Sequence, residues 1–152
     1  AYFSLERHSL STAKEMAKTI LRMRDSGSYF FLIDAPTSVV SEVAQLTRDE
    51  DIYLFNTTAI GDSLRNEACQ KHLFHMTASR AMRTDALSQY LVERKWKKIL
   101  ILRGPLTEDQ LMASAFEKSA AQFGLKIVEI RDFDNSTLYF ETVVSPSSNE
   151  FY

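Results

Sequence analysis

Three short polar segments carry the side chains best suited to hold a small polar molecule. Residues 34–38, 56–59 and 103–105 each follow an apolar run of four or five residues. The first two segments are rich in hydroxyl and amide groups, which both donate and accept hydrogen bonds. Capping and turn formation favour the same residue types, so the sequence leaves both roles open. The candidate ligand contacts in these segments are Thr37, Ser38, Asn56, Thr57, Thr58 and Gly104.

A second group of candidates lies at the start of a predicted helix near the middle of the chain. Ser79 and Arg80 begin this helix, and a guanidinium group can hold a carboxylate through two parallel hydrogen bonds. We therefore predict both residues as ligand contacts. A salt bridge between the lobes or a solvated side chain in the first helical turn is the alternative role for Arg80.

Cys69, His72 and His75 are spaced three residues apart, which superficially resembles a metal-binding cluster. Structural zinc sites generally use four ligands, and in an extended segment His72 and His75 would point to opposite faces. Packing or surface roles are the better interpretation of these residues. We predict no metal ion.

Sequence signatures of enzymes are missing. The chain has four glycines, and neither a phosphate-binding loop nor a dinucleotide fingerprint can be formed from them. There is also no nucleophile elbow and no His-Glu-x-x-His zinc helix. We predict a binding protein without catalytic residues and without a cofactor.

Charge and composition narrow the range of partners. Lys and Arg number 18 against 20 Asp and Glu, so the net charge is −2 and provides no positive field for nucleic acid. Hydrophobic residues make up 45% and charged residues 25% of the chain, as in ordinary folded proteins. No apolar run approaches the ~18 residues of a membrane span, so direct membrane insertion is not expected. A single cysteine excludes an intrachain disulfide and leaves the compartment open.

The hydrophobic pattern predicts an alternation of helices and strands. Helices are expected at about 12–24, 39–46, 79–94 and 107–123, and strands at 29–33, 52–55, 99–102 and 126–130. Capping-box spacing at Thr12 and Glu15, and at Thr107 and Gln110, marks two helix starts, and Gly124 marks a stop. A helix between two fully apolar strands favours a parallel pair, buried on both faces and joined by a right-handed crossover.

These elements predict an α/β fold with parallel-sheet βαβ units in two small Rossmann-like lobes. Residues 1–77 would form the first-lobe unit and residues 78–131 the second. Residues 56–78 show no sustained helical period and are interpreted as a connector with a short extended segment near its end. The tail at 132–152, with a β-prone stretch at 139–144, has no assigned role.

The stretch from residue 29 to about residue 130 resembles the type I periplasmic binding proteins, the branched-chain amino-acid receptor superfamily. Three runs carry the resemblance: HMTASRAM at 75–82, LSQYLV at 87–92 and KWKKILIL at 95–102. In that family a helix of the form ALAQYLVEKGWKKVAVL leads from the first lobe into the sheet of the second. The resemblance implies two lobes that close around a solute like a hinge.

A narrower resemblance comes from LFNTTA at 54–59, DSLR at 62–65, Cys69 and LFH at 73–75. These residues are similar to the substrate-binding component of an ABC transporter associated with quinoprotein (PQQ)-dependent alcohol catabolism. This implies a periplasmic location after removal of a signal peptide, an ABC transporter permease as partner, and a small organic solute bound without catalysis. The alternative is a sensor or regulatory protein that uses the same fold to bind a metabolite or a protein partner.

Members of this family are more than twice as long as these 152 residues. The chain is therefore either a fragment or a shortened relative that completes its sheets with another chain. Exposed sheet edges favour such association, so a homodimer is expected in the second case.

Overall fold

The structure is a computed structural model that describes residues 5–133. The chain divides into two compact units, Ala1–Ser79 and Arg80–Tyr152. Each unit is built from parallel strands and the helices that connect them, so the α/β fold class with parallel βαβ units is confirmed. The predicted lobe boundary after residue 77 stays a prediction. The β-prone stretch at 139–144 lies outside the described residues.

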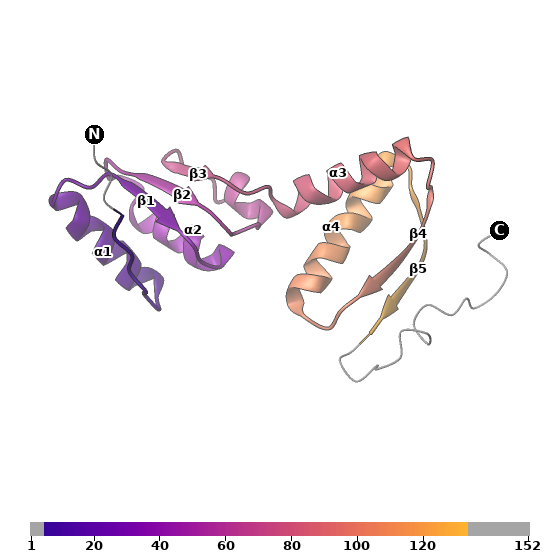
Figure 1. The fold of residues 1–152 in the computed structure, drawn as a ribbon, viewed down its shortest axis with the longest axis horizontal. Coiled ribbons are helices and arrows are strands. Elements are labelled where there is room, and N and C mark those ends of the chain that lie inside the picture. Colours follow the sequence, from indigo (N-terminus) through magenta and orange to yellow (C-terminus); the bar gives the residue numbers. More distant parts are fainter. Residues whose placement is uncertain (1–4, 134–152) are drawn as a thin grey trace. The chain divides into compact units, whose positions relative to one another are not determined.

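The first unit contains a three-stranded parallel sheet in the order β1-β2-β3 (Figure 1). Its helices are α1 (Ala13–Asp25), α2 (Thr37–Leu46) and the short 3₁₀ helix η1 (Asp62–Arg65), and its strands are β1 (Phe30–Ile33), β2 (Tyr53–Asn56) and β3 (Leu73–His75). The segment interpreted as a connector therefore supplies a third strand, which pairs in parallel with β2. This strand corresponds to the short extended segment predicted near the end of the connector, which the sequence pattern did not place in a sheet.

Helix α1 begins as its sequence predicts. Thr12 is the N-cap, and its side-chain oxygen accepts a hydrogen bond from the backbone N–H of Glu15 at 3.2 Å. The Glu15 carboxylate accepts a hydrogen bond from the Ser11 hydroxyl at 2.9 Å. The helix ends at Ser26, and Gly27 follows in the left-handed region at φ +94°.

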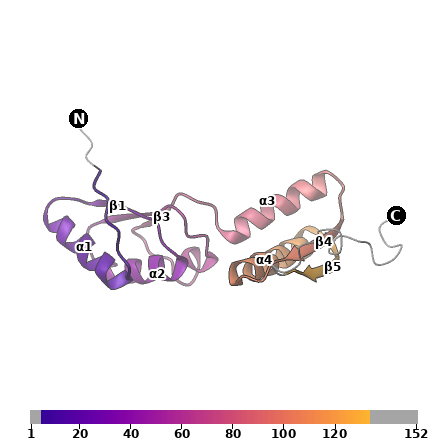
Figure 2. The same ribbon diagram turned by 60° about the horizontal axis from the view of Figure 1, so that its bottom comes forward.

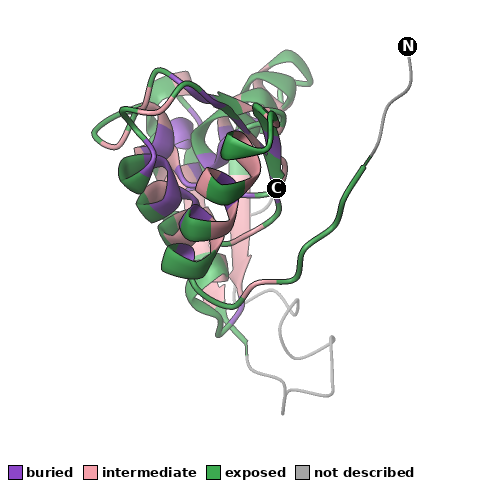
Figure 3. Ribbon diagram, turned by 90° about the vertical axis from the view of Figure 1, so that its left-hand side faces the viewer, coloured by how far each residue is buried: buried purple, intermediate pink, exposed green. Residues whose placement is uncertain are grey.

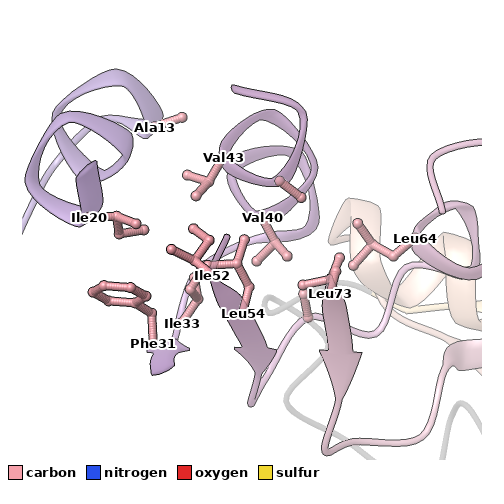
Figure 4. Packing of buried hydrophobic residues seen from close by; sticks show 12 residues of the cluster. Ala13, Ile20, Phe31, Ile33, Val40, Val43, Ile52, Leu54, Leu64 and Leu73 are labelled. Atoms are coloured by element: carbon pink, nitrogen blue, oxygen red, sulfur yellow. The ribbon is translucent and has the colours of Figure 1, made fainter. Parts of the chain in front are cut away.

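The core of the first unit lies between the two α-helices and one face of the sheet (Figure 4). Burying each aliphatic side chain of this kind stabilises the fold by about 1.5–3 kcal/mol. Exposed and buried residues alternate along β1, and Figure 3 shows buried and exposed stretches on the same helices. The core includes Ile20 of α1, Val40 and Val43 of α2, Phe31 and Ile33 of β1, Leu54 of β2 and Leu73 of β3.

The opposite face of this sheet is not buried, and the prediction of strands buried on both faces is wrong here. Phe30 and Leu32 of β1 are 68% and 62% exposed, while their neighbours Phe31 and Ile33 are buried. Helices α1 and α2 contact one another and cover only the Phe31 side. An apolar run indicates that a strand can be covered on both faces, but it does not supply the second cover.

The second unit repeats the helix–strand–helix–strand order with α3 (Arg80–Glu93), β4 (Lys98–Arg103), α4 (Thr107–Phe123) and β5 (Lys126–Asp132). Strands β4 and β5 are parallel, and α3 packs against α4 (Figures 1 and 2). Phe116, Ala120 and Leu125 form the centre of a small apolar core. Gly124 ends α4 in the left-handed conformation at φ +72°, as its sequence predicts.

Helix α4 begins with a different cap from the predicted Thr107–Gln110 pair. Leu106 occupies the N-cap position, and its backbone N–H donates to the Asp109 carboxylate at 3.1 Å. The acidic residue at the third helical position therefore provides the side-chain acceptor. Thr107 is already the first residue of the helix.

Candidate functional site

The carboxyl ends of the three parallel strands of the first unit meet at one edge of the sheet. Ile33, Asn56 and His75 are the last residues of β1, β2 and β3, and they are register partners across the sheet. In open parallel sheets this edge is where ligands bind, because loops and helix N-termini present polar groups there. Five of the predicted contacts lie at or just beyond this edge, and they are Thr37, Ser38, Asn56, Thr57 and Thr58.

Asn56 holds the loop after β2 in place through its side-chain hydrogen bonds. Its side chain is buried, and its oxygen accepts the backbone N–H groups of Thr58 at 3.2 Å and Ala59 at 2.8 Å. Its amide nitrogen donates to the Ala59 carbonyl oxygen at 2.7 Å and contacts Nδ1 of His75 at 3.1 Å. An asparagine side chain has two donor and two principal acceptor positions, and all four are used. Direct ligand contact by Asn56 stays a prediction that this network does not favour.

Thr57 and Thr58 tie the loop after β2 to the neighbouring strand. The Thr57 hydroxyl donates to the carbonyl oxygen of Ile33 at 3.0 Å. The Thr58 hydroxyl donates to the Asp34 carboxylate at 2.9 Å, and this pair is exposed. Asp34 and Thr58 together therefore present a carboxylate and a hydroxyl to solvent. Asp34 was missing from the predicted contacts, although it directly follows β1.

Thr37 and Gly61 hold the loops after β1 and β2 close together. The Thr37 hydroxyl oxygen accepts the backbone N–H of Gly61 at 3.1 Å. A Cβ atom at position 61 would lie only 2.7 Å from that oxygen and 3.0 Å from the Thr37 Cβ atom. The two loops approach so closely here that position 61 has no room for a Cβ atom, and glycine is the only residue without one. Ser38, the next residue in α2, is exposed and so remains accessible to a ligand.

His75 is neutral in this arrangement. The Asn56 amide is oriented by its backbone partners, so it donates to Nδ1 of His75, which must then carry a lone pair. Burial lowers the pKa of His75, the nearby Arg65 guanidinium lowers it further, and a hydrogen bond with the Leu64 backbone opposes both effects. A neutral imidazole avoids placing a second positive charge beside Arg65.

Arg65 is a functional candidate that the sequence did not reveal. It ends the 3₁₀ helix η1, and its Nη2 donates to the carbonyl oxygen of Thr77. Its Nη1 is buried and has no hydrogen-bond partner within the described residues. A buried guanidinium nitrogen without a partner is costly, so an acceptor supplied by a ligand would be stabilising here. The four-residue η1 has no helical period that could have marked it.

The three residues of the apparent metal motif are not gathered into a metal site. His72 is buried at the start of β3, and its Nε2 lies 3.2 Å from the Thr47 hydroxyl oxygen. That hydroxyl donates to the carbonyl oxygen of Val43, so His72 must act as the donor to Thr47. Cys69 is exposed. Within residues 5–133, no three His, Cys, Asp or Glu side chains form a group that could hold a metal ion.

The remaining predicted contacts lie in the second unit or at its boundary. The buried Arg80 donates from Nη2 to the Glu108 carboxylate of α4 at 2.6 Å. This salt bridge lies within the second unit and is not the interlobe salt bridge considered from sequence. Gly104 is buried at the end of β4, and a Cβ atom there would lie 2.9 Å from the Asp109 carboxyl carbon. Ser79 is buried immediately before α3. Ligand binding by these three residues stays a prediction.

Comparison with known families identifies the chain. The family model described as periplasmic binding protein matches residues 10–146. The chain belongs to the periplasmic binding protein family. A search of curated protein sequences finds no significant match.

Solved structures of periplasmic binding proteins share this fold. A branched chain amino acid ABC transporter periplasmic ligand-binding protein from Burkholderia xenovorans has a TM-score of 0.73 and 16% identity, and the match covers 86% of this chain and 35% of that one. An ABC transporter substrate-binding protein from Desulfitobacterium hafniense has a TM-score of 0.67 and 16% identity, covering 80% of this chain and 35% of that one. A solute-binding protein of an ABC transporter from R. palustris, in complex with benzoate, has a TM-score of 0.59 and 15% identity, covering 86% and 36%.

The chain spans about a third of the length of these solved structures. At 15–16% identity the likeness establishes the fold alone. The names of these relatives describe binding proteins, as does the family name. Within the described residues, no helix combines the length and the apolar character that crossing a membrane requires.

Proposed function

We propose that this chain is part of the periplasmic solute-binding component of an ABC transporter, and that it binds a small organic molecule without transforming it. The observation that supports this most directly is the carboxyl edge of the first sheet, where hydrogen-bonding side chains from the loop after β1, from the end of β2 and its loop, and from the end of β3 converge. An ABC transporter permease is the proposed protein partner. Enclosure of the solute between two lobes stays a prediction from the family resemblance.

The edge contains two kinds of polar group with different roles. Asn56, Thr57 and Thr37 use their side chains to fix the loops, through hydrogen bonds to Ala59, Ile33 and Gly61. This frame positions groups that remain accessible, which are the Asp34 carboxylate, the Thr58 hydroxyl and Ser38. A site held rigid in this way loses little conformational entropy when a solute binds.

The chemistry of this edge suits a solute that carries both a donor and an acceptor. Asp34 would accept a hydrogen bond from a hydroxyl or ammonium group, and the buried Nη1 of Arg65 would donate to an acceptor if the solute or a water reaches it. Structural neighbours were solved with leucine and with benzoate. The narrower resemblance to proteins of quinoprotein-dependent alcohol catabolism adds small alcohols and aldehydes to the proposed solutes.

A thermal-shift screen tests this function. The panel contains leucine, benzoate, short alcohols, aldehydes and organic acids, each added to the purified chain. A solute that binds only the folded state at ~100 times its Kd stabilises that state by about 2.7 kcal/mol, so the melting temperature should rise by several degrees. If no member of any class raises the melting temperature, solute binding by this chain is contradicted.

Two exposed aspartates provide the variant and its matched control. Asp34→Ala removes the accessible carboxylate at the proposed site, and Asp49→Ala removes an exposed carboxylate in the turn before β2, at the opposite end of that strand from the edge. We expect Asp34→Ala to weaken binding of the identified solute about tenfold, in keeping with one lost charged hydrogen bond. Asp49→Ala should bind like the parent chain, and equal weakening by both variants would argue against the proposed edge.

A further inference from the structure

The imidazole ring of His75 connects β3 to both β2 and η1 at the carboxyl edge of the first sheet. Its Nδ1 accepts a hydrogen bond from the Asn56 amide nitrogen, 3.1 Å away. A second hydrogen bond joins the ring to the backbone of Leu64, and because this bond raises the pKa of His75, the ring is the donor there. Since Nδ1 accepts, the donor to Leu64 is Nε2. The ring therefore carries its single proton on Nε2.

Asn56 links this ring to the loop after β2. The Asn56 side-chain oxygen accepts the backbone N–H groups of Thr58 and Ala59, and its nitrogen donates to the carbonyl oxygen of Ala59. The amide cannot turn its oxygen toward His75 without losing both backbone N–H groups. The same loop positions the Thr58 hydroxyl, which donates to Asp34 at the proposed solute site. A change at the ring therefore reaches groups that are accessible to a solute.

A proton on Nδ1 would break the contact between the ring and Asn56. The imidazolium ion has an N–H on both nitrogens and no acceptor, so Nδ1–H would face the donating NH₂ group of Asn56. Either these two groups separate, or the Asn56 amide turns over and leaves the N–H groups of Thr58 and Ala59 without their acceptor. Each response removes hydrogen bonds that hold the loop after β2.

The surroundings of the ring keep it neutral at neutral pH. The elements that His75 contacts, η1 and β2, carry two charged side chains, Asp62 and Arg65, both on η1. Burial lowers the pKa of His75, and the positive charge of Arg65 lowers it further. The ring therefore takes up its second proton at a pH below about 6.5, the usual pKa of histidine.

We propose that His75 is a positioning residue whose neutral imidazole holds the solute site in its binding form, so that acidification weakens solute binding. This regulation rests on the proposed function of the same edge. His75 does not touch the solute and acts through Asn56 and the loop that contains Thr58. The loss of about one hydrogen bond from the loop should weaken solute binding about three- to tenfold.

Nuclear magnetic resonance of the isotope-labelled 152-residue chain tests the role of His75 without a solute. At about pH 7.5 the ring nitrogens should show the Nε2–H form, and as the pH falls to about 4.5 the ring should titrate. The backbone N–H signals of Thr58 and Ala59 should move with the same midpoint. Their protection from hydrogen exchange, relative to the intrinsic rate at each pH, should fall about three- to tenfold.

Three results of this measurement would overturn the proposal. They are a ring that carries its proton on Nδ1 at neutral pH, a ring that does not titrate in this range, and a ring that titrates while Thr58 and Ala59 do not respond. These results come from the parent chain, so they do not depend on whether a variant folds.

Two glutamine variants separate His75 from other groups that titrate. The side chain in His75→Gln can accept from Asn56 and donate to Leu64 but cannot take up a proton, so the loop should form and lose its response to pH. His72→Gln changes the histidine just before β3 and should leave the response unchanged. A response caused by Asp34 would survive in both variants, and its survival in His75→Gln would overturn the role of His75.

Solutes from the thermal-shift panel provide a second readout. The Kd of each solute that binds should rise about three- to tenfold in the parent chain between about pH 7.5 and pH 4.5, and the rise should be absent from His75→Gln. Comparison of the two chains cancels any protonation of the solute itself. An equal rise in both chains would overturn the proposal. A loop that responds to His75 while no solute binds would instead contradict the proposed function.

Discussion

Substitution of Gly61 by alanine should loosen the carboxyl edge of the first sheet. A Cβ atom at this position would approach the Thr37 hydroxyl oxygen to 2.7 Å and the Thr37 Cβ atom to 3.0 Å, and its closest approach would be to the Thr37 methyl carbon. Gly61 has φ −63°, which alanine adopts freely, so the cost is steric and not conformational. Overpacking of this kind destabilises by about 1–3 kcal/mol.

Substitutions at Thr37 separate this clash from the hydrogen bond. Thr37→Ala removes the two closest clashing atoms, the methyl carbon and the hydroxyl oxygen, but leaves the backbone N–H of Gly61 without its acceptor, which costs about 1–3 kcal/mol. If the reasoning is correct, the free energy of unfolding of the double variant Thr37→Ala/Gly61→Ala lies within about 1 kcal/mol of that of Thr37→Ala alone. Thr37→Val keeps the side-chain volume and removes the hydroxyl, so adding Gly61→Ala to it should cost the full steric penalty.

Urea denaturation followed by far-ultraviolet circular dichroism measures these free energies of unfolding. The only tryptophan, Trp96, lies in the second unit, so its fluorescence reports that unit separately. The reasoning is refuted if Gly61→Ala changes stability by less than about 0.5 kcal/mol, or if its cost is the same beside alanine and threonine at position 37.

Two further predictions concern buried polar groups. Burial, and to a lesser extent the neighbouring Lys71, lowers the pKa of His72, so the unfolded chain takes up the proton first as the pH falls below about 6.5. The free energy of unfolding should therefore decrease as the pH falls from about 6.5 toward the lowered pKa of His72. Urea denaturation at several pH values should show a smaller decrease in the His72→Gln variant than in the parent chain. The Ser119 hydroxyl donates to Ser88 at 2.9 Å within the second unit. Each single alanine variant should lose about 1–3 kcal/mol in thermal or urea unfolding, and the double variant should lose less than the sum of the two; strict additivity would show that the hydroxyls are not coupled.

Local signals explain what the sequence predicted well. Thr12 caps a helix through a residue three positions away, and Gly124 ends one through its own backbone conformation. The alternation of apolar runs and amphipathic segments similarly predicted the parallel pairs β1–β2 and β4–β5. These features depend on residues close together in the chain.

Contacts between distant segments explain what the sequence could not reveal. Asn56 looked like a ligand contact because amides bind solutes, but its partners include His75, 19 residues away. The contact of Arg65 is with the carbonyl oxygen of Thr77, which lies 12 residues further along the chain. The exposed side of β1 depends on which segments cover the sheet, and no pattern within the strand contains that information.

The absence of any antiparallel pairing among the described strands has a consequence for the folding pathway. Register partners are separated by roughly 20–30 residues along the chain, so no strand pair can form as a local hairpin. Each pairing must first close a long loop, and the intervening helix shortens the distance that the loop has to span. We therefore expect helical signal to precede sheet formation in stopped-flow refolding, with folding slower than that of a helical bundle of the same size.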